Sequence, residues 1–220
     1  MESLIQTLAV YALPVIFAIT LHEAAHGYVA RHFGDPTAWQ LGRISLNPIR
    51  HIDPVGTILV PVMILAMSTL AGSGGMLFGW AKPVPVNFGR LRRPKQDMLW
   101  VAAAGPGANL AMALGWALLL KLAIAISGNP YALPLAEMSR AGIEVNAVLM
   151  LLNLLPLPPL DGGRIAVSLL PHRAAWQFAK LEPYGFVILL ALLFTGILGV
   201  VLGPLMHIFM SLIRALFAFH

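Results

Sequence analysis

The sequence predicts an all-α polytopic membrane protein, with a re-entrant or hairpin segment between the first helix and the helix that carries Gly105–Asn109. Of the 220 residues, 59% are hydrophobic and only 10% are charged, whereas a soluble domain has about 25% charged residues. The hydrophobic residues also form long runs, and about 20 apolar residues are enough for a helix to cross a bilayer. We therefore expect a single membrane-embedded domain over residues 1–220, with about five to six membrane helices.

The apolar runs are expected to form helices over residues 4–31, 97–126, 143–155, 183–202 and 204–219. Pro14 is expected to kink the first helix. A polar loop is expected from Ser127 to Arg140, and Gly203–Pro204 is expected to form a tight turn between the last two helices. The segment from Phe78 to Asn87 cannot be helical, because Pro83 and Pro85 interrupt it.

The basic residues predict the orientation in the membrane. Segments 31–53, 73–97 and 161–182 carry three, five and three Lys or Arg residues, and segment 127–142 carries one. Since cytoplasmic loops are rich in Lys and Arg, the first three segments are expected in the cytoplasm and the N-terminus outside. Residues 55–71 then have cytoplasmic flanks on both sides and are expected to re-enter, the alternative being a full crossing. Basic residues in short loops indicate membrane lipid as a partner rather than nucleic acid.

A metal-binding motif closes the first apolar run. There is no cysteine, so a metal would have to bind to His, Asp or Glu. His22 and His26 are four positions apart, which places both imidazoles on one face of a helix, and Glu23 lies between them in the sequence. Ionisable residues at bilayer depth usually mark function. The motif therefore predicts a zinc site with one Zn²⁺ per chain.

Asp161 is the best candidate for a third zinc ligand. It follows a helix end broken by Pro156, Pro158 and Pro159, and two glycines after it are expected to let the backbone turn. The helices over residues 4–31 and 143–155 are both expected to run from outside to inside. His22, His26 and Asp161 lie toward the cytoplasmic ends of these helices, so the three ligands would share one depth. An Asp-Gly-Gly sequence is also an ordinary turn signal, and Glu144 is a weaker alternative ligand.

Three further residues are candidates for contacts with a substrate. The amides of Asn109 and Asn153 could stabilise an oxyanion or hold a substrate backbone, or they could instead join helices. Lys82 could contact a substrate, the alternative being a lysine that reaches to the membrane interface. The remaining histidines are expected to be interfacial: His32, His51, His172, His207 and His220.

These motifs resemble the site-2 protease family of intramembrane zinc metalloproteases. The resemblance rests on His22–His26, Gly105–Asn109 and Asn153–Gly163, in that order, and the segments Gly34–Pro36 and Phe78–Asn87 look like its compact bacterial and archaeal branch. It implies that His22, His26 and Asp161 bind zinc, and that Glu23 is the general base on a zinc-bound water. It also implies substrates that are transmembrane segments of membrane proteins, cleaved within the bilayer.

We expect a catalytic core over about residues 4–164, and the apolar runs predict a C-terminal helix pair over about 183–219. We also expect an integral protein of a prokaryotic cell membrane, and the basic loops predict that its active site lies toward the cytoplasmic side. Two other functions compete with proteolysis. A catalytically silent homologue could bind or regulate membrane partners, although it would not need to keep Glu23. A metal transporter would need a ladder of polar residues, which the apolar runs do not show.

Overall fold

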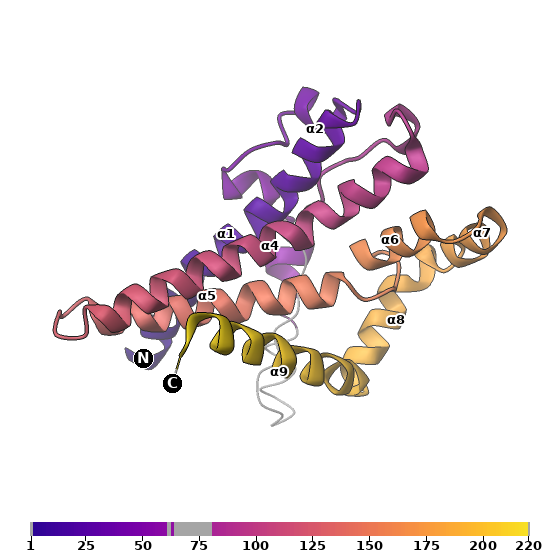
Figure 1. Ribbon diagram of the computed structural model, residues 1–220. Helices are drawn as coiled ribbons and strands as arrows, with labels where there is room; N and C mark the ends of the chain where they lie inside the picture. The colour runs from indigo at the N-terminus through magenta and orange to yellow at the C-terminus, as the bar shows by residue number, and fades with distance from the viewer. Residues whose placement is uncertain (1, 61–62, 64–80, 220) are drawn as a thin grey trace.

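The computed structural model describes residues 2–60, 63 and 81–219, and these residues form helices but no strand. Three long helices pack against one another: α1 (Glu2–His32), α4 (Pro94–Ala125) and α5 (Ala132–Asn153). Figure 1 shows α4 and α5 running side by side, with the shorter helices gathered toward their ends. The other elements are α2 (Thr37–Gln40), η1 (Pro48–His51), η2 (Pro54–Leu59), η3 (Phe88–Arg90), α6 (Asp161–Leu169), α7 (His172–Ala179), α8 (Glu182–Phe194) and α9 (Ile197–Phe217).

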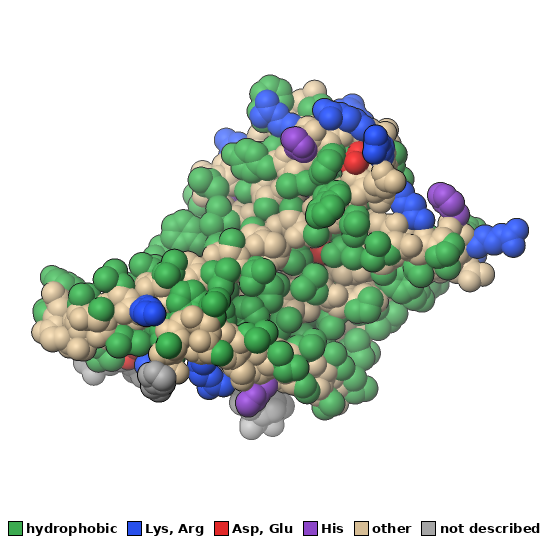
Figure 2. Space-filling model, viewed as in Figure 1, with side chains coloured by type: hydrophobic (Ala, Val, Ile, Leu, Met, Phe, Trp, Pro, Cys, Tyr) green, Lys and Arg blue, Asp and Glu red, His purple; other side chains and the backbone are tan. Residues whose placement is uncertain are grey.

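Three helices among the described residues are long and apolar enough to cross a membrane: Ala9–His32 of α1, then α4 and α9. The pair α7 and α8, which is bent by 62°, adds a fourth if the two form one broken span. Large hydrophobic side chains are exposed along these helices, and Figure 2 shows them over much of the visible face. Such exposure suits a surface in contact with lipid and indicates a membrane protein.

The predicted helices over residues 4–31 and 97–126 are confirmed as α1 and α4. Residues 81–87 are not helical, as Pro83 and Pro85 predict. The re-entrant segment is tested only at its start, where η2 is a short π-helix. Residues 61–62 and 64–80 lie outside the described residues, so the re-entrant path and the count of about five to six membrane helices stay predictions.

The predicted loop from Ser127 to Arg140 is wrong in its second half, because α5 begins at Ala132 and not at Ile143. Pro134 lies in the first turn of α5, where the missing N–H group has no helical partner to lose. No later proline interrupts the helix before Ile143, and Ser139 is fully buried in it. The polar side chains were therefore part of a helix rather than a sign of a loop.

The predicted turn at Gly203–Pro204 is also wrong, because Pro204 lies inside α9. The chain turns instead at Gly196, between α8 and α9, where the backbone has a φ of 76°. This left-handed conformation is open to glycine but strained for other residues. The N–H group of Gly196 donates to the carbonyl of Leu193 and closes α8.

A close contact between α4 and α5 forms part of the core. Gly142 of α5 lies against the indole ring of Trp116 of α4, and a Cβ atom at Gly142 would overlap that ring. Ile143 and Ile213 complete the cluster from α5 and α9. Small residues allow such close helix approach in membrane proteins.

Replacing Gly142 with alanine is expected to lower the free energy of unfolding by about 1–3 kcal/mol, the usual effect of overpacking a core. Gly115→Ala is the control, because a Cβ atom at Gly115 would meet no other atom within 4 Å. Thermal unfolding in detergent, followed by circular dichroism, measures both variants. Equal unfolding temperatures for the two variants would contradict the packing of Trp116 on Gly142.

Candidate metal centre

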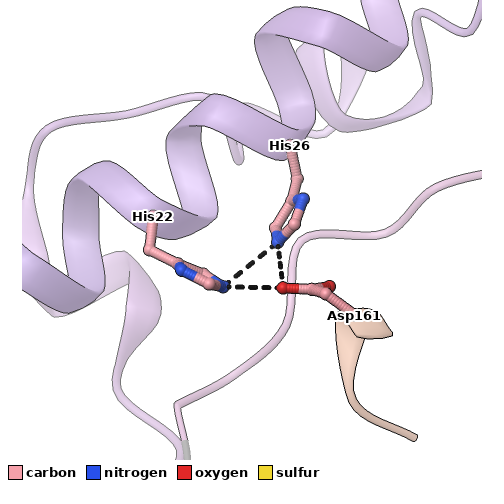
Figure 3. A group of neighbouring side chains, drawn as sticks. All are labelled: His22, His26 and Asp161. Carbon is pink, nitrogen blue, oxygen red and sulfur yellow. Dashed lines mark hydrogen bonds and ion pairs between the residues drawn. The ribbon is translucent and has the colours of Figure 1, made fainter. Parts of the chain in front are cut away.

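The structure brings together His22, His26 and Asp161, as Figure 3 shows. The two histidines lie one turn apart on α1, and Asp161 is the first residue of α6. The His22 Nε2 and His26 Nε2 atoms are 3.2 Å apart. Asp161 Oδ2 lies 3.2 Å from His22 Nε2 and 3.3 Å from His26 Nε2. All three residues are buried, with exposed fractions of 7 to 8%.

The glycines after Asp161 act differently from the expectation. Gly162 and Gly163 lie in the first turn of α6 and have no left-handed backbone. A Cβ atom at either position would collide with the preceding loop, at the carbonyl of Leu155 or at the backbone of Pro158. The glycines therefore let that loop pack onto α6, and this packing places Asp161 opposite the histidines.

The hydrogen bonds of the two imidazoles leave their Nε2 atoms free to bind a metal. His26 Nδ1 lies 2.7 Å from the carbonyl oxygen of Val101, which can only accept, so Nδ1 donates. His22 Nδ1 donates to Asn109 Oδ1. The Asn109 amide is fixed in this orientation, since its Nδ2 donates to Asn146 Oδ1 at 2.9 Å. Such partners on the second ring nitrogen are typical of histidines that bind metals.

The donor set fits a zinc ion. With Nδ1 protonated on both rings, two nitrogen lone pairs and the Asp161 carboxylate face one another, and Asp161 Oδ2 is buried without a hydrogen bond. Ligand atoms on a tetrahedron with bonds of about 2.0–2.1 Å lie about 3.3–3.4 Å apart. The observed separations of 3.2 to 3.3 Å match this spacing. Three protein ligands with one open position are typical of hydrolytic zinc sites.

Gly105 of α4 allows this arrangement. A Cβ atom there would lie 2.5 Å from His26 Nε2 and 2.6 Å from His22 Nε2. The close approach of α4 to the histidines of α1 therefore takes place at Gly105. A Cβ atom at Gly107 would meet no other atom within 4 Å.

Glu23 is partly exposed and bonds to the non-helical segment 81–87 rather than to the ligand cluster. Its Oε2 accepts a hydrogen bond of 2.7 Å from the backbone N–H group of Val84. The described residues give its other oxygen, Oε1, no hydrogen bond. This places one free carboxylate oxygen on the residue next to a ligand histidine.

The three candidates for substrate contacts lie in different surroundings. Asn109 is fully buried, and its side chain forms hydrogen bonds with His22, Asn146 and the carbonyl of Ala18. Asn153 is half-buried and donates to the carbonyl of Leu149 on its own helix. Lys82 is exposed, and its backbone joins segment 81–87 to η1. An oxyanion or substrate contact by any of the three stays a prediction.

Asn146 is a site residue that the sequence motifs did not indicate. It is fully buried on α5, and its Nδ2 donates to the carbonyl of Gly142 at 2.8 Å while its Oδ1 holds Asn109. An asparagine within an apolar helix is the signal that could have found it. Glu144 is exposed and accepts from the Tyr11 hydroxyl at 3.3 Å, away from the cluster. His51, expected to be interfacial, is buried, and its Nε2 donates to the carbonyl of Ser45.

Asp35 fastens segment 81–87 to the end of α1. Its buried carboxylate accepts from the Asn87 N–H group at 2.6 Å and from the hydroxyl and N–H groups of Thr37. Burial alone would raise the pKa of Asp35, but these hydrogen bonds and the charge of Arg90 hold the pKa below its usual range. The ionised form is therefore the one that supports the segment beside Glu23.

Because the pKa of Asp35 is lower in the folded state, its contribution to stability is present above the unfolded pKa of about 3.9 and is lost as the pH falls below it. Asp35→Asn is expected to cost about 1–3 kcal/mol at pH 7, since an amide cannot accept all of these bonds. The free energy of unfolding of Asp35→Asn should also fall less steeply than that of wild type below about pH 4. Unfolding temperatures at several pH values measure this, with the exposed Glu137→Gln as control. A pH dependence unchanged in Asp35→Asn would contradict the assignment.

The comparisons with known proteins agree with a metal site of this kind. No family model and no solved structure matches the chain. The chain is 40% identical over 198 residues to a Bacillus subtilis protein named "Putative zinc metalloprotease YwhC", and the match covers 89% of this chain and 84% of YwhC. The chain belongs to the YwhC family of zinc metalloproteases.

Two mycobacterial proteins named "Putative zinc metalloprotease Rip2" are also similar to this member of the YwhC family. The Mycolicibacterium smegmatis protein is 31% identical over 186 residues, which cover 84% of this chain and 66% of that protein. The Mycobacterium tuberculosis protein is 27% identical over 181 residues, which cover 80% of this chain and 63% of that protein. Within the described part of this YwhC-family chain, His22, His26 and Asp161 are the one cluster of three side chains suited to a metal.

Proposed function

We propose that this protein is an intramembrane zinc endopeptidase that hydrolyses peptide bonds in or near transmembrane segments of other membrane proteins, as in the site-2 protease family. The observation that carries the proposal is the position of the ligand cluster. His22 and His26 belong to an apolar helix long enough to cross a membrane, and they lie six to ten residues before its end at His32. At about 1.5 Å per residue, the site is then roughly 9–15 Å inside that end of the helix.

His22, His26 and Asp161 would hold one zinc ion. When bound, the ion would polarise the scissile carbonyl and activate a water molecule. Glu23 takes a proton from the attacking water through its free carboxylate oxygen. It then passes the proton to the leaving amine as the C–N bond breaks, which restores its charge. The hydrogen bond from Val84 orients the Glu23 carboxylate for both transfers.

The substrate has to be extended where it is cut, because the carbonyls of a transmembrane helix are hydrogen-bonded within the helix. Segment 81–87 has no helical structure and touches Glu23 through Val84. A substrate strand could pair with this segment by strand addition. Asn153 and Lys82 remain candidates for contacts with such a strand.

The basic residues support an orientation in a prokaryotic cell membrane with the N-terminus outside. Lys and Arg side chains gather at the end of the molecule that carries α2, where Figure 2 shows several of them close together. In this orientation α1 ends on the cytoplasmic side. The metal cluster, near that end of α1, would then face the cytoplasmic half of the membrane.

The decisive experiment compares wild-type protein, Glu23→Gln and Glu144→Gln in proteoliposomes that contain a panel of transmembrane substrates. Wild type and Glu144→Gln should each bind one zinc ion and cleave at least one substrate. Glu23→Gln should keep zinc but cleave at least about 100-fold more slowly, since general-base catalysis contributes about 10²–10⁴-fold. Glu144 is a fair control because it is exposed in the middle of α5 and bonds only to Tyr11 among the described residues.

Two outcomes would overturn the proposal. Equal processing by wild type and Glu23→Gln would remove Glu23 from the chemistry. Zinc-loaded wild type that retains substrates without cutting any of them would favour the alternative of a catalytically silent homologue that binds membrane partners.

A further inference from the structure

A second site of distinct chemistry lies where the turn after α2, the η1 helix and segment 81–87 meet. It is an open pocket of about 420 Å³, which we call the basic pocket. Three cationic residues and three hydrophobic residues line it together with Gly42: Arg43, Arg50 and Lys82, and Leu41, Ile49 and Ile52. None of these residues belongs to the metal cluster.

The positive charge of the basic pocket is uncompensated. No carboxylate within the described ranges lies within ion-pair distance of Arg43, Arg50 or Lys82, since the ion pairs found there all involve Asp161. Asp53 directly follows Ile52 of the basic pocket, but its carboxylate accepts hydrogen bonds from the N–H groups at the start of η2.

The protein's own hydrogen bonds use only part of the donors in the basic pocket. Arg43 Nη2 donates to the carbonyl of Lys82 at 2.9 Å, and Arg50 Nη1 donates to the carbonyl of Gly42. Arg43 Nε is buried without a partner. Guanidinium groups have five N–H donors, so most of those on Arg43 and Arg50 remain for a ligand. Guanidinium and ammonium groups in one pocket favour a phosphate group.

The hydrophobic side of the basic pocket points to a lipid. Ile49 and Leu41 are 72% and 63% exposed, beside the cationic residues. Nearby, the Arg31 guanidinium stacks on the exposed Trp39 ring at 4.4 Å. Exposed tryptophan and arginine just beyond a membrane helix are typical of the headgroup level. A free phosphate ion would gain nothing from the hydrophobic residues, whereas the acyl chains of a phospholipid would cover them.

We propose that the basic pocket binds the phosphate group of an anionic phospholipid, with Arg43, Arg50 and Lys82 on the headgroup and Leu41, Ile49 and Ile52 against the start of the acyl chains. This site is separate from the metal cluster and from Glu23, because it shares no residue with them and needs no zinc. It would fix the depth of the α2 end of the molecule in the membrane.

The test titrates the purified full chain in detergent with three probes by calorimetry: short-chain phosphatidylglycerol, phosphatidylcholine of the same chain length, and inorganic phosphate. Phosphatidylglycerol should bind at one per chain and more tightly than the other two. Lys82→Gln and Arg50→Gln should each weaken it about fivefold, and the double variant about 25-fold, as expected for cations at a membrane surface. Lys82→Gln removes a side chain without a hydrogen bond in the described structure, so folding should be unaffected.

Two control variants separate the sources of binding. Arg173→Gln, an equal charge change on the exposed face of α7, should leave phosphatidylglycerol binding unchanged. Ile49→Ser should weaken phosphatidylglycerol severalfold and leave inorganic phosphate as it is. The proposal is overturned if the double variant binds phosphatidylglycerol like wild type, or if Arg173→Gln weakens binding as much as Arg50→Gln. It is also overturned if inorganic phosphate binds as tightly as the lipid and Ile49→Ser changes neither.

Discussion

Gly105→Ala is expected to reduce zinc affinity at least about 100-fold, the upper end of what losing a supporting contact costs at a metal site. The added Cβ atom would lie 2.5 to 2.6 Å from the Nε2 atoms of His26 and His22. Non-bonded carbon and nitrogen atoms need about 3.5 Å. Either both imidazoles rotate away or α4 moves off α1, and in both cases two of the three ligands lose their positions.

Gly107→Ala is a matched control for this prediction. It adds the same methyl group two residues further along the same helix, where no other atom lies within 4 Å. Both changes raise helix propensity by about 1 kcal/mol, so a difference between them reports contacts rather than propensity. Zinc per chain after dialysis against a chelator, with circular dichroism to check the fold, measures the effect. Stoichiometric zinc in Gly105→Ala at wild-type affinity would show that α4 does not approach the histidines in this way.

The parts of this protein that could be predicted from the sequence depend on local patterns. The bounds of α1 and α4 follow from continuous hydrophobic runs, and the pairing of His22 with His26 follows from helical periodicity. The sequence predicts Asp161 as a ligand because it follows a helix end broken by prolines and precedes two glycines. Its neighbours Gly162 and Gly163 have a packing role that only the path of the preceding loop shows.

The parts that could not be predicted depend on contacts between distant segments. The polar residues around Ser139 predict a loop, but Ser139 is fully buried inside α5, so a polar residue type does not mark an exposed segment here. The carbonyl of Val101 holds His26, and a backbone acceptor leaves no signal in residue type. The bond between Glu23 and the Val84 N–H group joins residues 61 apart in sequence. The Gly203–Pro204 pair predicts a tight turn, yet Pro204 lies inside α9 and Gly196 makes the turn.

Asn109→Ala is expected to lower zinc affinity about 10–100-fold, the cost of losing an outer-shell partner of a ligand histidine. Without Asn109 Oδ1, the Nδ1–H group of His22 has no acceptor in its buried position, and the ring can adopt the other tautomer. Asn146→Ala should have a smaller effect of the same kind. Asn146 acts only through Asn109, by holding the amide so that its oxygen and not its nitrogen faces His22.

Asn153→Ala provides the matched comparison, because Asn153 bonds to its own helix and does not touch a ligand. The zinc affinity of Asn153→Ala, measured by competition with a chromophoric chelator, should equal that of wild type. The loss of zinc affinity should therefore be largest for Asn109→Ala, smaller for Asn146→Ala and absent for Asn153→Ala. A cleavage assay on zinc-loaded protein then separates two roles. If Asn153→Ala keeps zinc but cleaves more slowly, Asn153 acts on the substrate or the oxyanion. If Asn153→Ala loses zinc as readily as Asn109→Ala, the hydrogen-bond chain from Asn146 through Asn109 to His22 is not what orients the metal ligands.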